Sequence, residues 1–410
     1  MFDSTLTYRA RIWMGIVLFI VLSFSWSERL SSIGIILLSL HFLLDQHLLE
    51  KCRKFRLSAP LLLMWTFFGV QLLAMGWTNH WSDVGQSVMV KLSFLVLPFL
   101  LSTENYLDTK QTRFLFWCFS TSLLLSFTYS AIMDYVRYIP FGWNAVLNRV
   151  NISEAIMHPG YYSNYFALVT TWHLVSLLHD KNLARKTILL HLFFIGFGVL
   201  VLLLLIAKTC IIYLAIVGLY VSWQLLLPIK NSGLRIIAYL ASWILIAGIA
   251  LQIPTIKNRI HEAQQDRQHI DKNIGLANST GSRVIAWQNE WILIKQKPLL
   301  GYGTGSANAV LQQQLAENGY QHLASDGMHT HHQIFHTWLD TGILGVLSLL
   351  MMMIVFAKNF WQQKHTMGLA LLLLFVLNLL TDDMLEVQAG LVFFVMFFCL
   401  FLFQPQAARD

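Results

Sequence analysis

Long apolar runs, separated by short polar segments, repeat along the whole chain. Each run is continuous and does not alternate apolar with polar positions, which favours helices over half-buried strands. Most runs have roughly 14–22 residues, enough for a helix to cross a hydrocarbon core of about 30 Å. Lipid offers no hydrogen-bonding partner for backbone N–H and C=O groups, so a segment that crosses the membrane must be a helix or a strand of a closed barrel. The expected spans lie near residues 12–25, 31–45, 60–77, 86–102, 112–133, 160–179, 187–206, 208–227, 233–252, 336–357, 366–381 and 386–403.

Composition supports this interpretation. Of the 410 residues, 56% are hydrophobic and 12% are charged, whereas an ordinary soluble domain carries about 25% charged residues. This composition argues strongly against a soluble helical protein. The pattern predicts an all-α polytopic membrane protein with about 12 transmembrane helices.

Lysine and arginine are distributed unevenly between the loops. Basic residues are frequent in the loops KCRKFR (51–56) and DKNLARK (180–186). The short loops on the opposite side contain few, namely Arg29, Arg137 and Arg149. Cytoplasmic loops carry the excess of positive charge, so the basic loops and both termini are expected in the cytoplasm. The net charge of +7 is explained by this topology and does not indicate nucleic-acid binding.

The same topology divides the chain into three parts. Residues 1–252 are expected to form an N-terminal transmembrane bundle of about nine spans, and 336–410 a C-terminal bundle of about three. Between them, 253–335 forms one large loop on the outer, periplasmic side, where we expect the chemistry. Two short helices are predicted in this loop, an amphipathic one that starts at STGS (279–282) and ends before Pro298, and a second at 306–317.

GYGTG (301–305) lies between these two helices. It has the glycine content of a phosphate-binding loop but lacks the Lys-Ser/Thr pair that completes such a motif. We interpret it as a glycine-rich turn.

Two cations are expected close to the outer membrane surface. Lys208 separates two apolar runs, and Arg283 opens the amphipathic helix. Lys208 fits either a snorkelling residue at a hairpin turn or a cation directed at an anionic group. Arg283 fits either an exposed charge or a phosphate contact, because a helix N-terminus already favours anions.

Four histidines crowd into HTHHQIFHTWLDTGILG (329–345), at the start of a predicted span. In a helix, His332, His336 and Asp340 share one face, which is a spacing that can bind a metal, but no HExxH or Cys/His pattern accompanies it. The other interpretations are a solvated helix end and a general base, since imidazole titrates near neutral pH. Acidic residues cluster in TDDMLE (381–386), where they are either solvated or orient a basic partner.

These features together resemble the O-antigen ligase family. His331 is followed by His332, nine residues and Gly342-x-x-Gly345, and the family has the same His and Gly spacing with Asn, Ser or Gln after the histidine. Arg283 begins a segment similar to the family's Arg…Trp…Pro-x-x-Gly-x-Gly. Lys208 stands where the family usually has an arginine. HPGYYSNYFAL (158–168) and TDDMLEVQAGLVFF (381–394) are also similar to family stretches.

The resemblance implies transfer of a glycan from undecaprenyl diphosphate to a hydroxyl of lipid A–core, at the periplasmic face of a Gram-negative inner membrane. It implies His331 as the general base and Arg283 with Lys208 as the cations that stabilise the diphosphate. It implies that the reaction inverts the configuration at the anomeric carbon and needs no ATP, cofactor or metal. Membrane lipid is an expected partner, and nucleic acid is not. Five further residues become candidate substrate-binding positions: His158, Tyr162, His332, Asp383 and Glu386.

Three alternatives remain. An O-antigen polymerase joins carrier-linked repeat units with a similar fold and similar cations, but the outer-loop length and the His331–Gly345 spacing favour a ligase. A protein O-oligosaccharyltransferase usually has a longer chain. A transporter of lipid-linked glycans predicts functional charges deep within the spans and tolerance of substitution at His331.

Overall fold

The computed structural model describes residues 7–138, 156–180, 182–205, 207–250 and 280–404, and every regular element in these ranges is helical. A helix or helix pair lies at each of the twelve predicted ranges. The N-terminal half comprises α1 (Tyr8–Ser23), α2 (Glu28–Leu43), α3 (Leu48–Lys54), α4 (Ala59–Ala74), η1 (Met75–Trp77), α5 (Trp81–Lys91), α6 (Ser93–Thr103), α7 (Thr109–Tyr138), α9 (Pro159–His179), α10 (Arg185–Leu204), α11 (Lys208–Leu226) and α12 (Ser232–Ala250). The remainder comprises α14 (Thr280–Gln296), α15 (Ala307–Glu317), α16 (Gln321–Ser325), α17 (Gln333–Gln362), α18 (Thr366–Leu379), η3 (Met384–Glu386) and α19 (Gln388–Leu402).

Six of the described helical segments are long and apolar enough to cross a membrane: Ala59–Trp77, Trp81–Thr103, Thr109–Arg137, Arg185–Leu204, Lys208–Leu226 and Gln333–Gln362. Three shorter apolar helices lie at Ser232–Ile244, Thr366–Leu379 and Gln388–Leu402. The all-α fold with several candidate membrane spans is thereby confirmed. The count of about twelve spans and the periplasmic side of the large loop stay predictions.

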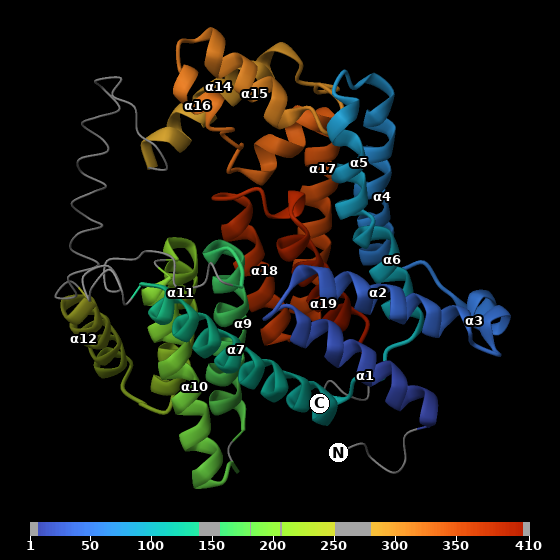
Figure 1. Ribbon diagram of the computed structural model, residues 1–410. Coiled ribbons are helices and arrows are strands. Elements are labelled where there is room, and N and C mark those ends of the chain that lie inside the picture. The colour runs from blue at the N-terminus through green and yellow to red at the C-terminus, as the bar shows by residue number, and fades with distance from the viewer. Residues whose placement is uncertain (1–6, 139–155, 181, 206, 251–279, 405–410) are drawn as a thin grey trace.

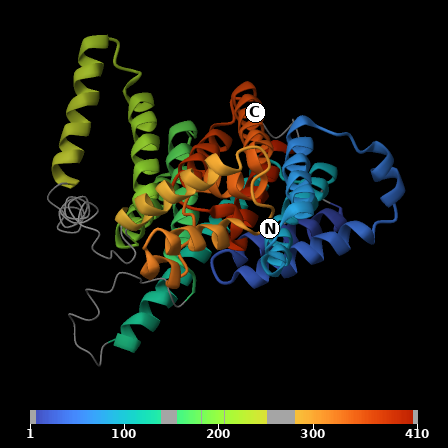
Figure 2. The same cartoon turned by 90° about the horizontal axis from the view of Figure 1, so that it is seen from above.

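Helix α19 forms the centre of the bundle. Every residue from Ala389 to Leu402 is buried, as expected for a helix that is apolar on all sides. Its phenylalanines pack against neighbouring helices; for example, the Phe24 and Phe393 ring centroids are 5.7 Å apart. Figures 1 and 2 show α9–α11 on one side of the α17–α19 group and α1–α6 on the other.

Helices α14–α16 form a layer over one end of the bundle, above α17 (Figures 1 and 2). Both helices predicted between 279 and 317 are confirmed, since α14 ends just before Pro298 and α15 begins at Ala307. The first part of the predicted outer loop, 253–279, lies outside the described residues.

The GYGTG turn joins this layer to α17. Its three glycines have positive φ, and the backbone N–H groups of Tyr302 and Gly303 donate to the carbonyls of Leu339 (2.6 Å) and Asp340 (2.9 Å). The Asp340 carboxylate in turn accepts hydrogen bonds from the N–H groups of Gly305, Ser306 and Ala307, at 2.9–3.1 Å, where α15 starts. The interpretation of this stretch as a glycine-rich turn is confirmed.

The two glycines of Gly342-x-x-Gly345 have a packing role. Gly342 has φ 66° and kinks α17, and a Cβ there would overlap the backbone of Leu299. A Cβ at Gly345 would overlap the Thr341 side chain. Because glycine tolerates both a positive φ and such close approach, Gly342 lets α17 pack against the segment that follows α14, and Gly345 makes room for the Thr341 side chain within α17.

Candidate functional site

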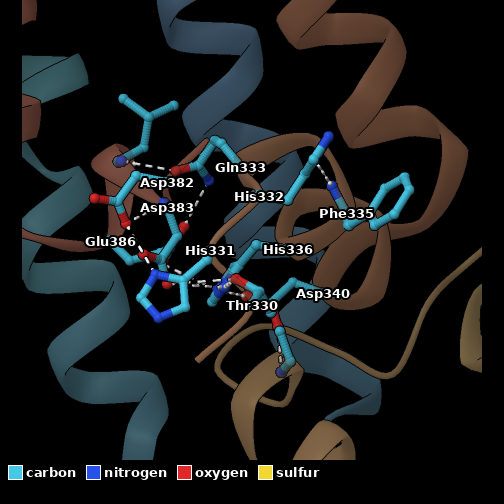
Figure 3. Close-up of polar contacts among 12 residues, drawn as sticks. Thr330, His331, His332, Gln333, Phe335, His336, Asp340, Asp382, Asp383 and Glu386 are labelled. Atoms are coloured by element: carbon cyan, nitrogen blue, oxygen red, sulfur yellow. Dashed lines mark hydrogen bonds and ion pairs between the residues drawn. The ribbon is translucent and has the colours of Figure 1, made fainter. Parts of the chain in front are cut away.

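The turn between α18 and α19 places three carboxylates against the start of α17 (Figure 3). The carbonyl of Asn378 accepts the N–H groups of Thr381 (3.0 Å) and Asp382 (2.8 Å), which closes the last turn of α18. Asp382 and Asp383 then face segment 330–336, and Glu386 follows in η3. TDDMLE is therefore mostly buried and forms one polar cluster with the histidine stretch.

His331 has a strained backbone and an accessible ring. Its φ of 45° lies in the left-handed region, which non-glycine residues rarely adopt and which often marks functional sites. The imidazole is 28% exposed, and its Nδ1 lies 3.4 Å from Asp382 Oδ1. With a proton on Nδ1 directed at Asp382, the Nε2 lone pair is available to accept a proton.

Asp382 is suited to hold that tautomer. Burial alone would raise the pKa of its carboxyl, but the hydrogen bond from His331 and the positive charge of Arg283 lower it to about 2. Asp382 is therefore an anion at neutral pH. In the adjacent Asp383, burial and the Asp382 charge together raise the pKa to about 6. The two neighbouring carboxyls thus differ in how readily they ionise.

His336 lies deeper, on the first turns of α17. Its Nδ1 is 3.0 Å from the Thr330 hydroxyl, and its Nε2 is 3.3 Å from Glu386 Oε2 and 3.6 Å from Asp340 Oδ2. The side chain is 5% exposed. The predicted proximity of His336 and Asp340 is present, and His336 additionally contacts Glu386.

His332 is directed away from the acidic turn (Figure 3). Its Nδ1 accepts the N–H of Phe335 at 3.3 Å and caps α17. Its ring packs against Phe335, with centroids 4.2 Å apart, and against Trp287. The structure therefore places His332 at the helix cap and does not bring it to His336 and Asp340.

Lys91 is a functional candidate that the sequence analysis did not identify. Its side chain is fully buried at the end of α5, where Nζ lies 2.5 Å from Glu386 Oε2 and 2.8 Å from the Ser87 hydroxyl. Burial opposes the charge on Glu386, but His336 and Lys91 lower the pKa of that carboxyl overall. A lysine within the predicted span 86–102 was an available signal, because charges inside spans need a partner.

Arg283 and the start of α11 meet the same turn from the other side. Arg283 Nη1 donates to the Thr381 carbonyl at 3.0 Å. Thr209, next to Lys208, has its hydroxyl 2.9 Å from that of Thr381. Lys208 is the first residue of α11, whose N-terminus carries partial positive charge. Arg283 and the first turn of α11 thus meet at Thr381.

The candidates from α9 differ in position. His158 caps α9 by accepting the N–H of Gly160 at 3.2 Å. A Cβ on Gly160 would lie 3.7 Å from Asp382 Oδ2, so the first turn of α9 borders the acidic turn. Tyr162 is fully buried, and its hydroxyl lies 2.5 Å from that of Ser126, within the bundle.

Glu290, on α14, is a second residue that sequence reasoning missed. It is fully buried, and neither carboxyl oxygen has a hydrogen-bond partner in the part of the chain that the structure describes. Burial raises its pKa well above the usual range, and it interacts electrostatically with His336 and Asp383. The seven-residue spacing from Arg283 puts both on one face of the helix, and that spacing was the available signal.

Two sets of side chains in the described residues have the geometry to hold a metal ion: His331 with Asp382 and Asp383, and His336 with Asp340 and Glu386. In the second set, Asp340 already accepts three backbone N–H groups, and Glu386 is bonded to Lys91 and Gln333. These oxygens are committed to protein donors, so the first set is the better candidate.

Comparison with known proteins supports the family resemblance. Residues 192–350 match the family model described as O-antigen ligase. The matched segment contains Lys208, Arg283 and His331, whereas His158, Tyr162 and the acidic turn lie outside it. No curated protein matches the chain. The resemblance that rests on the His331 and Arg283 motifs is confirmed by the family match.

Proposed function

We propose that this chain, whose residues 192–350 match the O-antigen ligase family model, transfers a glycan from undecaprenyl diphosphate to a hydroxyl of lipid A–core. One observation carries the proposal. Arg283, the start of α11 and the His331–Asp382 pair converge on residues 381–382 from different elements. A cationic site and a proton-accepting site thus lie side by side, as glycosyl transfer from a diphosphate requires.

The cations would act on the donor. When the anomeric C–O bond breaks, its electron pair goes to the diphosphate oxygen, where negative charge develops. Arg283 and Lys208, together with the N-terminus of α11, stabilise that charge as fixed donors do in other transition states. The donor carries its own leaving group, so the reaction consumes no ATP. The cations supply the positive charge, and the proposed mechanism includes no metal.

The histidine would act on the acceptor. As a hydroxyl of lipid A–core attacks the anomeric carbon from the side opposite the diphosphate, His331 Nε2 takes its proton. Asp382 orients the ring and stabilises the imidazolium, as a carboxylate does beside other catalytic histidines. Backside attack in a single step inverts the anomeric centre. His158, Asp383 and Glu386 border the site, and we retain them as substrate-binding candidates together with His332 and Tyr162.

The proposed location follows from charge. Basic loops place 1–252 and 336–410 in the inner membrane, as bundles of about nine and about three spans, with 253–335 in the periplasm. Helices α14–α16 then cover the active site on its periplasmic side. The donor, the acceptor and membrane lipid are the expected partners.

The test is a lipopolysaccharide gel of a Gram-negative strain lacking this gene, with carrier-linked glycan extracted in parallel. A ligase predicts lipid A–core without polymer while full-length polymer accumulates on the carrier. Lipid A–core capped by a single repeat would instead assign a polymerase. Normal lipopolysaccharide with loss of glycan from proteins would assign an oligosaccharyltransferase. Loss of both products with short glycan retained on the carrier would assign a transporter.

A further inference from the structure

A crevice of about 870 Å³ lies between α2 and the α5–α6 pair. One part of it is lined by apolar side chains, among them Ile35, Ile36 and Val96. Met89 and Ile36 are 73% and 59% exposed, so the walls offer hydrocarbon contacts. Glu28, Arg29, Gln86 and Gln388 line the polar part. The crevice therefore changes from apolar to polar along α2.

A smaller cavity of about 310 Å³ continues from the polar end. The two cavities share Glu28, Arg29 and Val387 as lining residues. The smaller one is lined further by His158 and Tyr161 from the start of α9. An aromatic ring among groups that donate and accept hydrogen bonds is a surface suited to a sugar.

Both cavities border the cluster of charged residues formed by Lys91, His331, His336, Asp340, Asp382, Asp383 and Glu386. Glu386, which pairs with Lys91 and His336, lines the crevice itself. The first turn of α9, which lines the smaller cavity, borders Asp382. The cavities thus reach the turn through residues 386–389, whereas Arg283 and α11 contact it at Thr381.

We propose that the crevice binds an acyl chain of the acceptor glycolipid and that the smaller cavity takes sugars of its head group. This inference rests on the proposed function and names the route of one substrate. The amphipathic crevice matches an acylated saccharide, whose tail remains in lipid while its hydroxyls reach His331. Arg29 lies where the cavities join and suits an acidic group on that head.

The geometry assigns the crevice to the acceptor rather than the donor. Inversion requires the attacking hydroxyl and the leaving diphosphate to lie on opposite sides of the anomeric carbon. Arg283, which suits the diphosphate, contacts Thr381 at one end of the turn, and the cavities are lined by residues 386–389 at the other end. A substrate that enters between α2 and α5 therefore approaches from the acceptor's side.

A large side chain at position 85 would fill the crevice without contacting the cluster of charged residues. Gly85 is exposed, lines the crevice, and a Cβ there meets no atom within 4 Å. The matched control is Gly196→Trp on α10, because Gly196 is also exposed with open space around it. Purified proteins in liposomes are assayed for initial rates against acceptor and donor mole fraction.

Gly85→Trp is expected to raise the acceptor KM about tenfold, which corresponds to roughly 1.4 kcal/mol of binding. The donor KM and the behaviour of Gly196→Trp are expected to match wild type. An unchanged acceptor KM, or a rise in the donor KM instead, overturns the assignment. If the wild-type protein does not ligate at all, the proposed function fails. If the wild-type protein is active and Gly85→Trp leaves the acceptor KM unchanged, only the assignment of the crevice fails.

Crosslinking identifies the occupant directly. A photo-reactive amino acid at position 89 is irradiated in membranes that contain lipid A–core, carrier-linked glycan and phospholipid, and adducts are identified by mass. An adduct with lipid A–core is the expected result. Capture of the isoprenoid carrier, or of phospholipid without lipid A–core, overturns the proposal.

Discussion

Two clusters of buried charge lie at opposite ends of α6. One joins the ends of α1, α2 and α6 and contains Arg9, His41, Asp45, Lys51 and Glu104. The other, which we call the catalytic cluster, contains Lys91, His331, His336, Asp340, Asp382, Asp383 and Glu386. Both combine histidine, buried acids and a lysine or arginine, so residue content alone does not distinguish them.

Charge balance and access do distinguish them. In the first cluster, the two acids Asp45 and Glu104 each pair with both Arg9 and Lys51, so acids and permanent cations match. In the catalytic cluster acids outnumber permanent cations, one histidine is partly exposed, and Glu386 lines a crevice. Buried ion pairs are weak indicators of function. An unbalanced cluster beside a cavity is the stronger indicator, because a ligand or a transferred proton can complete it.

Replacing the accessible histidine should produce the largest difference between the clusters. His331→Ala is expected to lower ligation by about 10²–10⁴-fold, the usual contribution of a general base. The assay is turnover in membranes at matched protein level. His322→Ala, in the exposed part of α16, is the control and should remain near wild type. Near-normal ligation by His331→Ala would remove the base assignment.

Removing the lysine from an ion pair should lower the unfolding free energy of the protein more in the catalytic cluster than in the first cluster. Lys91→Met leaves Glu386 without its lysine and is expected to cost about 3–5 kcal/mol of unfolding free energy, as for other broken buried pairs. Lys51→Met should cost less, because Arg9 still pairs with Asp45 and Glu104. Denaturant unfolding in detergent measures both.

The double variant Lys91→Met/Glu386→Leu tests the cause. It removes both charges and is expected to recover much of the stability that Lys91→Met loses. A double variant as unstable as the single one would show that packing, and not the carboxylate left without its lysine, explains the loss.

Arg283 lies beside the catalytic cluster and Arg9 lies in the first cluster. Exchanging either arginine for lysine keeps the charge but removes the planar guanidinium geometry. Arg283→Lys is expected to raise the donor KM about tenfold, equivalent to roughly 1.4 kcal/mol, with little change in melting temperature. Arg9→Lys, the same change in the first cluster, should leave the donor KM unaltered. Equal donor KM values for wild type and Arg283→Lys would exclude the diphosphate role.

The smallest effect is expected at Glu290 and depends on pH. Burial raises its pKa in the folded protein, so its stabilising contribution is complete below the unfolded pKa, about 4.3, and is lost as pH rises. Glu290→Gln resembles the protonated side chain and should exceed wild type in stability at pH 8 by on the order of 1 kcal/mol. Near pH 4 the two should agree.

Thermal unfolding at both pH values measures this difference. Glu317→Gln, on the exposed face of α15, is the control and should show no such pH dependence. A pH-independent gap between Glu290→Gln and wild type would mean that Glu290 does not change its protonation state in this range.

Local pattern predicted much of the fold. The length of the apolar runs predicted the twelve helical ranges. Helix-capping residues, Pro298 and the glycines of GYGTG predicted the positions of α14, α15 and the turn between them. The central place of α19 was not predictable, because each apolar run satisfies the same length criterion and partners are set by packing across the bundle. The expected domain division and span count remain predictions.

The site was predictable where spacing within one segment defines it. His336 and Asp340, four residues apart on α17, are in contact. Lys91 and Glu386 are 295 residues apart in the chain, and no local pattern connects them. His332 was grouped with His336 on helical spacing, but it precedes the first turn of α17, so its ring satisfies a backbone N–H instead.

The attachment of Asp340 to the start of α15 has a mechanical consequence. Three hydrogen bonds and the GYGTG turn join the start of α15 to the part of α17 that precedes the kink at Gly342. Arg283 and His331 lie on the two sides of this connection, so we expect a tilt of α17 to move both together. We therefore expect the proposed donor site and the proposed proton acceptor to keep their relative positions when the surrounding bilayer deforms.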